Sequence, residues 1–253
     1  MNVISKGLGR IKYYEFEHPD LPSAFDGFTV AFLSDFHYKS IFNEKRLSKA
    51  VKTINRIHPD LLLLGGDYVE SCEYASELLL KISEIETSEG IIAVLGNNDY
   101  ENCYCEILTE INKHGIQLME HQTDSICKNN ECIYITGVRN PFDLKNNRVS
   151  PTLSLNSTHF VILLVHTPDY AENVSIHNSD LVLAGHTHGG QITLFGLYAP
   201  VLPSRYRQRF RSGKRYNSAG IPVFITNGLG TSQKNIRLFA PSEVMVITFR
   251  VRL

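Results

Sequence analysis

Short apolar runs that alternate with helix-like segments are the feature that most restricts the fold of this chain. The run Leu61–Leu64 consists of leucine alone, which is typical of a strand buried on both faces. Comparable runs lie at 28–33 and 91–95, and amphipathic helical patterns follow at 44–58 and 74–85. Such alternation predicts strands paired in parallel within an α/β fold.

The pattern changes towards the C-terminus, where strand signals predominate. A helix is expected at 101–113, a hairpin at 126–138 and a short helix at 169–174. The remaining strands are expected at 159–165, 180–183, 221–226 and 244–251. This β-rich half predicts a second sheet with more antiparallel pairing. No repeat or linker is visible in the 253 residues, so we expect one domain, 1–253.

Charge and cysteine content bear on the partners of the protein and on its cellular compartment. A formal net charge of −1 gives no general attraction to nucleic acid or to an anionic membrane. The five cysteines show no dense pairing pattern, which predicts free thiols and a reducing compartment. Residues 1–20 are polar and no run reaches the roughly 20 apolar residues that span a bilayer. We therefore expect a cytoplasmic chain without a leader, with peripheral contact to the inner membrane as an option.

Polar side chains follow five of the predicted strands at the points where those strands end. In open α/β sheets, ligands collect beyond the carboxyl ends of the strands, so these groups should converge in space. The candidate ligands are Asp35, His37, Asp67, Asn97, His166, His186 and His188.

The chemistry of this set predicts a metal centre. Carboxylates, one amide oxygen and imidazoles together suit Mn, Fe, Zn or Co better than calcium. Seven ligands exceed the need of one tetrahedral ion and fit two divalent ions that share a bridging carboxylate. Taken singly, Asp35 could cap a turn and His166 could be a core histidine. Seven such residues at strand ends are difficult to explain by chance.

The ordered motifs resemble those of the calcineurin-like metallophosphoesterases. They are Asp35-x-His37, Gly66-Asp67, Gly96-Asn97-Asn98-Asp99, His166 and Gly185-His186-Thr187-His188. The segments 227–232 and 236–239 resemble a bacterial subgroup that includes phosphodiesterases and enzymes that cleave UDP-diacylglucosamine, a lipid A precursor. The resemblance implies a two-sheet β-sandwich flanked by helices, a four-layer αββα fold.

The resemblance also implies roles for the candidate ligands. Asp35, His37 and His188 would bind the first metal, and Asn97, His166 and His186 the second. Asp67 would bridge both. A hydroxide bridging the metals would then cleave a phosphodiester or pyrophosphate, with a nucleotide-linked lipid as one candidate substrate. The alternatives are a broad small-nucleotide phosphodiesterase and a non-catalytic metal-binding scaffold.

Asn98 departs from the pattern, since the family usually has histidine there. Asparagine can donate a hydrogen bond but supplies no proton near neutral pH. We expect leaving groups that need no proton to be favoured and plain monoesterase activity to be weak. Asn98 and Asp99 are the candidate catalytic residues, with Asp99 or His121 as candidates to compensate. A harmless substitution at a tolerant position is the other interpretation.

The segment 203–216 concentrates positive charge shortly after the histidine motif. Its alternate residues Arg205, Arg207, Arg209 and Arg211 would share one face of a strand, with aromatic residues interleaved. We interpret these arginines as a candidate substrate-binding surface for phosphate or a membrane. Single-stranded nucleic acid is the less favoured partner. A solvated charged loop is the alternative.

Overall fold

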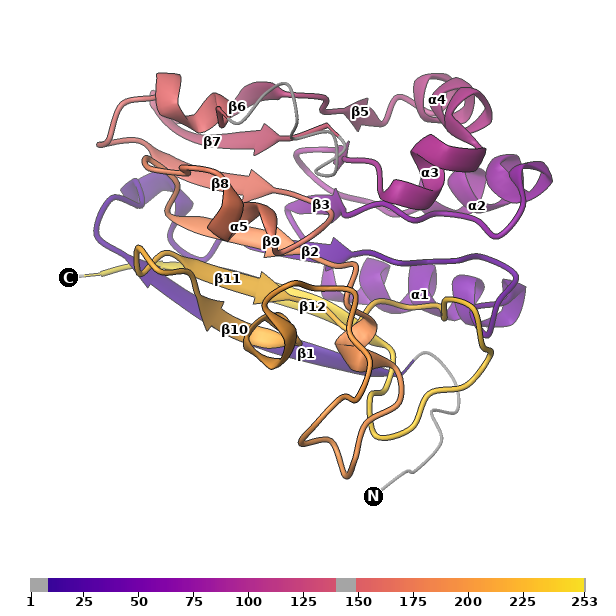
Figure 1. Cartoon of the computed structure of the whole chain (residues 1–253). Helices are drawn as coiled ribbons and strands as arrows, with labels where there is room; N and C mark the ends of the chain where they lie inside the picture. The colour runs from indigo at the N-terminus through magenta and orange to yellow at the C-terminus, as the bar shows by residue number, and fades with distance from the viewer. Residues whose placement is uncertain (1–8, 140–148, 253) are drawn as a thin grey trace.

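Two six-stranded sheets pack face to face in the computed structural model, which describes residues 9–139 and 149–252 (Figure 1). The first sheet has the order β1 (Arg10–His18), β12 (Glu243–Val251), β2 (Thr29–Leu33), β3 (Leu61–Leu64), β4 (Ile91–Ala93) and β5 (Gln117–Leu118). The second has the order β10 (Gly213–Tyr216), β11 (Pro222–Ile225), β9 (Leu181–Ala184), β8 (Phe160–Leu164), β7 (Glu131–Gly137) and β6 (Gln122–Lys128). All the strands that the apolar runs and the hairpin pattern predicted are present.

Both sheets are mainly parallel. Four of the five pairings in the first sheet and three of the five in the second are parallel. The second sheet has more antiparallel pairing than the first, as predicted, although it too is mainly parallel. Its two outer pairings, β6 with β7 and β10 with β11, are antiparallel. The central strands are joined by crossovers, which place their carboxyl ends at one edge.

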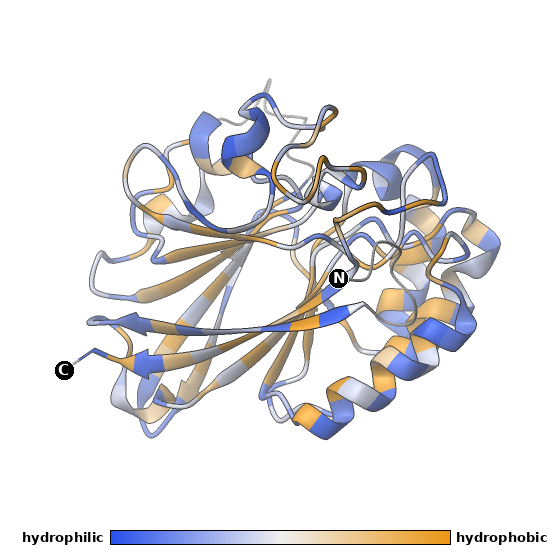
Figure 2. Ribbon diagram, turned by 90° about the horizontal axis from the view of Figure 1, so that it is seen from below, coloured by the Kyte–Doolittle hydropathy of each residue, from blue (hydrophilic) through white to orange (hydrophobic). Residues whose placement is uncertain are grey.

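The helices lie on the outer faces. They are α1 (Glu44–Ile57), α2 (Ala75–Ile82), α3 (Asn97–Asn102), α4 (Tyr104–Lys113) and α5 (Tyr170–Asn173). Asn43 caps α1, because its side chain accepts a hydrogen bond from the Arg46 backbone N–H at 3.2 Å. The helix expected at 101–113 is two helices, because the backbone at Cys103 leaves the helical region. Figure 2 shows α1 with orange and blue faces.

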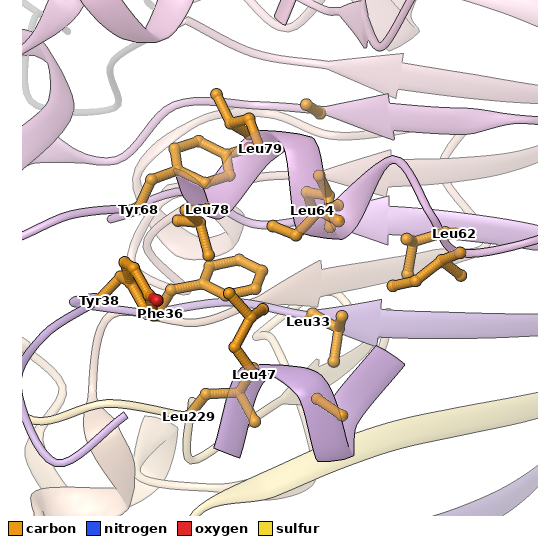
Figure 3. Close-up of a cluster of buried hydrophobic side chains, with 14 of the residues drawn as sticks. Leu33, Phe36, Tyr38, Leu47, Leu62, Leu64, Tyr68, Leu78, Leu79 and Leu229 are labelled. Carbon is orange, nitrogen blue, oxygen red and sulfur yellow. The ribbon is translucent and has the colours of Figure 1, made fainter. Parts of the chain in front are cut away.

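The run of leucines in β3 explains the layering. Leu62 and Leu64 face the helices, where they join a cluster with residues of α1, α2 and α4 (Figure 3). Leu61 and Leu63 point the other way and pack against the second sheet. A third cluster lies between the second sheet and α5. The resulting αββα order confirms the predicted fold class.

Three strands, β1, β5 and β10, were not predicted, and one predicted strand is absent. β1 alternates charged and apolar residues at the outer edge of its sheet, where one face meets solvent, and β10 is only four residues long. The arginine segment was expected to be extended, but 207–210 forms a 3-10 turn instead. The backbone at Arg207 is left-handed (φ 48°), so the four arginines do not share a strand face.

The prediction of free thiols is wrong for four of the five cysteines. Disulfides join Cys72 to Cys103 and Cys127 to Cys132, and Cys105 is free and exposed. Cys127 and Cys132 are direct partners across the β6–β7 hairpin, which brings their side chains together. Disulfides persist in oxidising compartments, so the cysteines no longer support a reducing one.

Within the described residues, no helix has the length and apolarity needed to cross a membrane. The expectation that residues 1–20 contain no leader rests partly on residues 1–8, which lie outside the described part of the chain.

Ile54→Ala should lower the free energy of unfolding by about 2–5 kcal/mol, because it leaves a cavity beneath α1. Urea denaturation followed by circular dichroism measures this change. Lys52→Ala, on the exposed face of the same helix, is the control and should change stability by less than about 0.5 kcal/mol. Equal effects of the two substitutions would contradict the assigned packing.

Candidate metal centre

The candidate ligands follow β2, β3, β4, β8 and β9 at one edge of the two packed sheets, and all lie on turns except Asn97, which is the first residue of α3. Five of them have left-handed backbone: Asp35 (φ 51°), His37 (φ 38°), Asp67 (φ 56°), His186 (φ 66°) and His188 (φ 52°). Non-glycine residues rarely adopt this conformation, and it concentrates at functional sites. The turns are therefore held in a costly geometry that aims the side chains inward.

The side chains gather into two groups, and within each group the ligand atoms lie within 4.8 Å of one another. One group contains Asp35, His37 and His188, and the other contains Asp67, His166 and His186. Asp67 Oδ2 lies 3.5 Å from His37 Nε2 in the first group and 3.4 Å from His166 Nε2 in the second. One carboxylate oxygen therefore faces both groups.

Two glycines allow this close packing. A Cβ atom at Gly96 would collide with the Asp67 carboxylate, and one at Gly185 would collide with the Asp35 carboxylate. The glycines that precede Asn97 and His186 in the motifs are therefore required by the approach of the loops to each other.

Hydrogen bonds orient the imidazole rings. His166 Nδ1 donates to the Gly65 carbonyl at 2.7 Å, and His37 Nδ1 lies 2.8 Å from Glu70 Oε1. Both rings thus direct Nε2 towards Asp67. Metal-binding histidines commonly have this arrangement, because a hydrogen bond at one ring nitrogen fixes the direction of the nitrogen that binds the metal. Glu70 was missed in the sequence, because only the fold brings it against His37.

A buried arginine supports the histidine loop. Arg237 donates hydrogen bonds to the backbone carbonyls of His188, Gly230, Asn227 and Ala240. It ties the loop of His188 to the C-terminal segment that precedes β12. Sequence motifs around 227–239 indicated this region, but they did not identify the contact.

Charge in the cluster centres on Asp67. Burial raises the pKa of Asp67, but the His166 and His37 rings outweigh burial and hold this pKa well below its usual value. Burial lowers the pKa of His166, while the carboxylates of Asp67 and Asp35 raise it, to about 9 overall. Burial and the charge of His166 lower the pKa of His186 to about 3. The buried carboxylate requires a positive partner, which a divalent cation can supply by displacing histidine protons.

Two atoms of the candidate ligands are among the buried side-chain atoms of the described residues that have no hydrogen-bond partner. They are Asn97 Oδ1 and His37 Nε2, the latter 3.5 Å from Asp67 Oδ2. Buried polar atoms in native proteins are nearly always satisfied. Both atoms belong to the candidate ligand set, and the donor set of oxygen and imidazole nitrogen fits borderline divalent cations.

The structure places Asp99 beneath the loops rather than at their surface. Its carboxylate accepts hydrogen bonds from the backbone N–H groups of Asp67, Tyr68 and Gly96 at 2.7, 2.9 and 2.8 Å. The residue is 1% exposed. Burial and the charge of Asp67 raise its pKa to about 7 against these three donors. Asp99 therefore positions the loops of Asp67 and Asn97, because backbone N–H groups of these loops occupy its carboxylate.

Asn98 lies at the partly exposed rim of the site. Its backbone N–H donates to Asp67 Oδ1 at 3.0 Å, and its side-chain Nδ2 donates to Asp67 Oδ2 at 3.2 Å. The side chain therefore lies within reach of a group bound above Asp67. His121, the other candidate to replace the family histidine, instead accepts a hydrogen bond from the Arg139 backbone through Nδ1.

The four arginines expected to bind substrate have different surroundings. Arg209 pairs with Glu172 at 3.2 Å, and Arg211 donates to the Gly196 carbonyl at 2.9 Å. Arg205 and Arg207 are exposed, and their side chains make no hydrogen bond or ion pair with the described residues. Two of the four are thus occupied within the fold, and two are available to a ligand.

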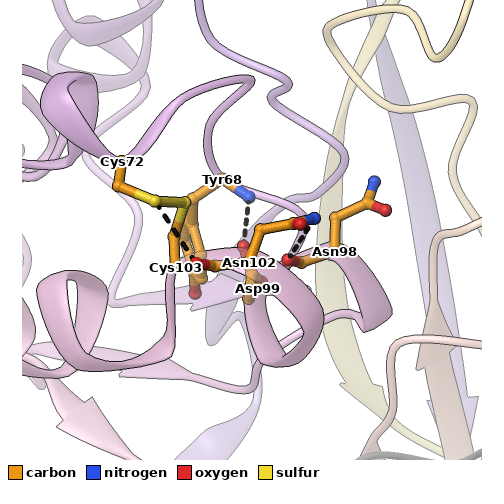
Figure 4. Close-up of a disulfide and its surroundings, with 6 residues drawn as sticks. All are labelled: Tyr68, Cys72, Asn98, Asp99, Asn102 and Cys103. Carbon is orange, nitrogen blue, oxygen red and sulfur yellow. Dashed lines mark hydrogen bonds between the residues drawn. A yellow bond between two sulfur atoms is a disulfide. The ribbon is translucent and has the colours of Figure 1, made fainter.

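A disulfide braces the metal-site loops. Cys72 follows the loop of Asp67, and Cys103 ends α3, the helix that carries Asn97 and Asn98 (Figure 4). The Cys72–Cys103 bond therefore joins the segments that supply two of the candidate ligands. It acts alongside the hydrogen bonds that the Asp99 carboxylate accepts from the same loops.

The αββα sandwich and its strand-end cluster of carboxylates and histidines define an α/β metallohydrolase. The family profile described as calcineurin-like phosphoesterase matches residues 28–190. The chain belongs to this family, and it is a metal-dependent phosphoester hydrolase.

Curated relatives agree with this assignment. The uncharacterized metallophosphoesterase YkuE of Bacillus subtilis is 28% identical over 91% of this chain and 82% of its own length. The phosphodiesterase YaeI of Escherichia coli is 30% identical over 87% of this chain and 81% of its own length. An uncharacterized metallophosphoesterase of Campylobacter jejuni is 26% identical, and this chain spans 61% of its length.

Among solved structures, the NAD nucleotidase of Haemophilus influenzae superposes with a TM-score of 0.54 at 15% identity. The match covers 80% of this chain and 45% of the nucleotidase. At this identity the likeness concerns the fold alone.

Replacing both Cys72 and Cys103 by serine should lower the free energy of unfolding by about 4 kcal/mol. Replacing both Cys127 and Cys132 by serine should lower it by only about 2 kcal/mol, because that bond closes a shorter loop. The first variant should also bind manganese more weakly, whereas the hairpin variant should not. Urea denaturation and calorimetric titration measure the two effects. Equal manganese affinity in both variants would show that the bond does not brace the site.

Proposed function

We propose that this chain hydrolyses a phosphodiester or pyrophosphate bond with the help of two divalent cations. The observation that carries the proposal is the position of Asp67 Oδ2, which faces a histidine of each ligand group. Asp35, His37 and His188 would hold one cation, and Asn97, His166 and His186 the other, with Asp67 shared. Two such cations supply a Lewis acid for the phosphoryl group and lower the pKa of water.

The residues of the chain determine which esters fit this centre. The Asn98 side-chain amide donates one N–H to Asp67 Oδ2, and its second N–H would be free for a phosphoryl oxygen, but the amide has no proton to transfer to a leaving group. Esters with good leaving groups, such as aryl oxides or nucleoside phosphates, therefore suit the site best. The name of the E. coli relative YaeI, a phosphodiesterase, supports this substrate class.

A nucleotide-linked lipid such as UDP-diacylglucosamine is our finer proposal for the substrate, with manganese as the cation and lipid A biosynthesis as the setting. Its pyrophosphate provides a nucleoside phosphate leaving group. Peripheral membrane contact follows from such a substrate. The disulfides favour a membrane face in an oxidising compartment over the cytoplasm.

Three substrates compared side by side test the proposal: bis-p-nitrophenyl phosphate, p-nitrophenyl phosphate and the UDP-linked lipid, each with manganese-loaded protein. We expect hydrolysis of the diester and of the pyrophosphate and little of the monoester. Diester turnover without lipid turnover would favour a broad small-nucleotide phosphodiesterase. Bound manganese without turnover of any substrate would favour a metal-binding scaffold.

Asp67→Ala should remove the shared ligand and lower kcat/KM for bis-p-nitrophenyl phosphate. Loss of a residue that only supports a ligand costs roughly 10- to 100-fold, and we expect a larger loss here. The manganese content, measured by elemental analysis, should fall from two equivalents. Glu70→Gln, which alters the partner of His37 while keeping its shape, is the matched control for a supporting residue. Unchanged metal content and activity in the Asp67 variant would refute the ligand assignment.

Asn98→His should raise turnover of an alkyl phosphate by about 100-fold, because histidine can protonate an alkoxide leaving group. Turnover of the aryl diester should change much less, since its leaving group needs no proton. Steady-state kinetics on both substrates measures the difference. Asn98→Ala is the control and should lower both rates through the lost hydrogen bond. An equal response of the two substrates to histidine would show that Asn98 does not determine leaving-group preference.

A further inference from the structure

Large exposed hydrophobic side chains are concentrated in one loop. Of the twelve among the described residues, six lie within 192–201, which we call the apolar loop: Ile192, Leu194, Phe195, Leu197, Tyr198 and Val201. Leu197 is 81% exposed, Val201 80% and Phe195 74%. A seventh, Ile236, lies on the adjoining loop, which pairs with Ile192 through Leu238. Apolar exposure on this scale marks an interaction surface.

The apolar loop is held firmly by the rest of the fold. Leu194 N–H donates to the Tyr198 carbonyl at 2.7 Å and closes a tight turn at its tip. Arg211 donates to the Gly196 carbonyl at 2.9 Å, and Gln208 exchanges two hydrogen bonds with the backbone of Ala199. The hydrophobic residues are therefore displayed by a defined structure. The loop follows β9 and precedes β10 in the chain; in Figure 1 it projects below the sheets, and in Figure 2 it carries orange stretches.

Within the segment that contains the apolar loop, the charged side chains have one sign, although Asp169 accepts a hydrogen bond from the Arg205 backbone and Glu172 pairs with Arg209. Residues 181–242 contain eight lysines and arginines and no aspartate or glutamate, although the whole chain has a net charge of −1. Arg205 and Arg207 follow the loop directly, and Lys234 lies beside its start, where its carbonyl accepts a hydrogen bond from Gln191. Apolar side chains projecting among exposed cations complement a layer of anionic head groups above an apolar interior.

We propose that the apolar loop and its flanking cations, Arg205, Arg207 and Lys234, dock the protein on an anionic lipid bilayer. The loop projects from the fold, so its tip is suited to insertion among acyl chains, whereas a protein partner would need a matching hollow. The cations would meet lipid phosphates at the depth of the head groups. The inference rests on the proposed function in one respect, because a lipid-linked substrate gives this surface its purpose.

The position of the surface relative to the metal centre strengthens the inference. The apolar loop begins two residues after Gly190, the end of the 3-10 turn that starts at His188. Arg211 binds the carbonyls of both Gly189 and Gly196, so one side chain joins the histidine turn to the apolar loop. Docking through this loop would hold the metal centre close to the lipid surface, within reach of a head group.

The absence of tryptophan from the chain allows a site-specific test. Leu197→Trp would place a single fluorophore at the tip of the loop, and Leu80→Trp would place one on α2, where Leu80 is also exposed. With vesicles of phosphatidylcholine and phosphatidylglycerol, we expect a blue shift and quenching by brominated lipid for the first variant alone. No shift at position 197, or equal shifts at both positions, would overturn the proposal.

Vesicle flotation of the full chain gives the second measurement. Phe195→Ser with Leu197→Ser should reduce the partition coefficient by about 100-fold, as expected when two large apolar side chains lose contact with the acyl region. Leu80→Ser is the matched control and should bind like the wild type. High salt or pure phosphatidylcholine should weaken binding, because the cations then lose their attraction. Loss of binding in the control, or a dimer that the double substitution dissociates without vesicles, would point to another occupant.

Hydrolysis of bis-p-nitrophenyl phosphate, measured in parallel, separates the two proposals. The Phe195/Leu197 variant should hydrolyse this soluble substrate like the wild type. If the wild type bound vesicles but did not hydrolyse this substrate, the proposed function would be refuted and the docking surface supported. If it hydrolysed the substrate but did not bind vesicles, the docking surface would be refuted and the proposed function supported.

Discussion

The hydrogen bonds of Asp99 hold the centre of this molecule together. One buried carboxylate accepts from the loop after β3 and from the loop after β4, and so fixes Asp67 relative to Asn97. Asp67 is in turn the group around which the histidines of both ligand groups are arranged. The strained turns and the two motif glycines are tolerated because these bonds and the packed sheets leave the loops no other arrangement.

Much of this organisation could be predicted from the sequence. Short apolar runs and helical periodicity gave most of the strands and helices, and the polar residues at strand ends predicted the cluster. These signals are local, since each depends on spacing within one segment. The clustering itself needed only one general rule about where parallel strands end.

What the sequence did not reveal depends on contacts between distant segments. Glu70 and Arg237 support the ligands from positions that no spacing connects to them. Cys72 and Cys103 are 31 residues apart, and only the meeting of two loops makes them partners. The arginines were expected on a strand because they alternate. The segment instead turns at Arg207, and two of the four arginines are bound within the fold. Alternation of charged residues without apolar partners is a weak strand signal.

The pairing of β1 with β12 has a consequence for how the chain acquires its structure. These strands pair in parallel over nine positions, from Arg10 with Glu243 to His18 with Val251, and the Arg10 guanidinium lies 2.7 Å from the buried Glu243 carboxylate. β12 also separates β1 from β2, so β1 has no place in the sheet until β12 has taken its position. During synthesis, β1 must therefore wait unpaired until the ribosome has made β12. The strand that joins β1 to the rest of the first sheet is thus more than two hundred residues away from it in the sequence.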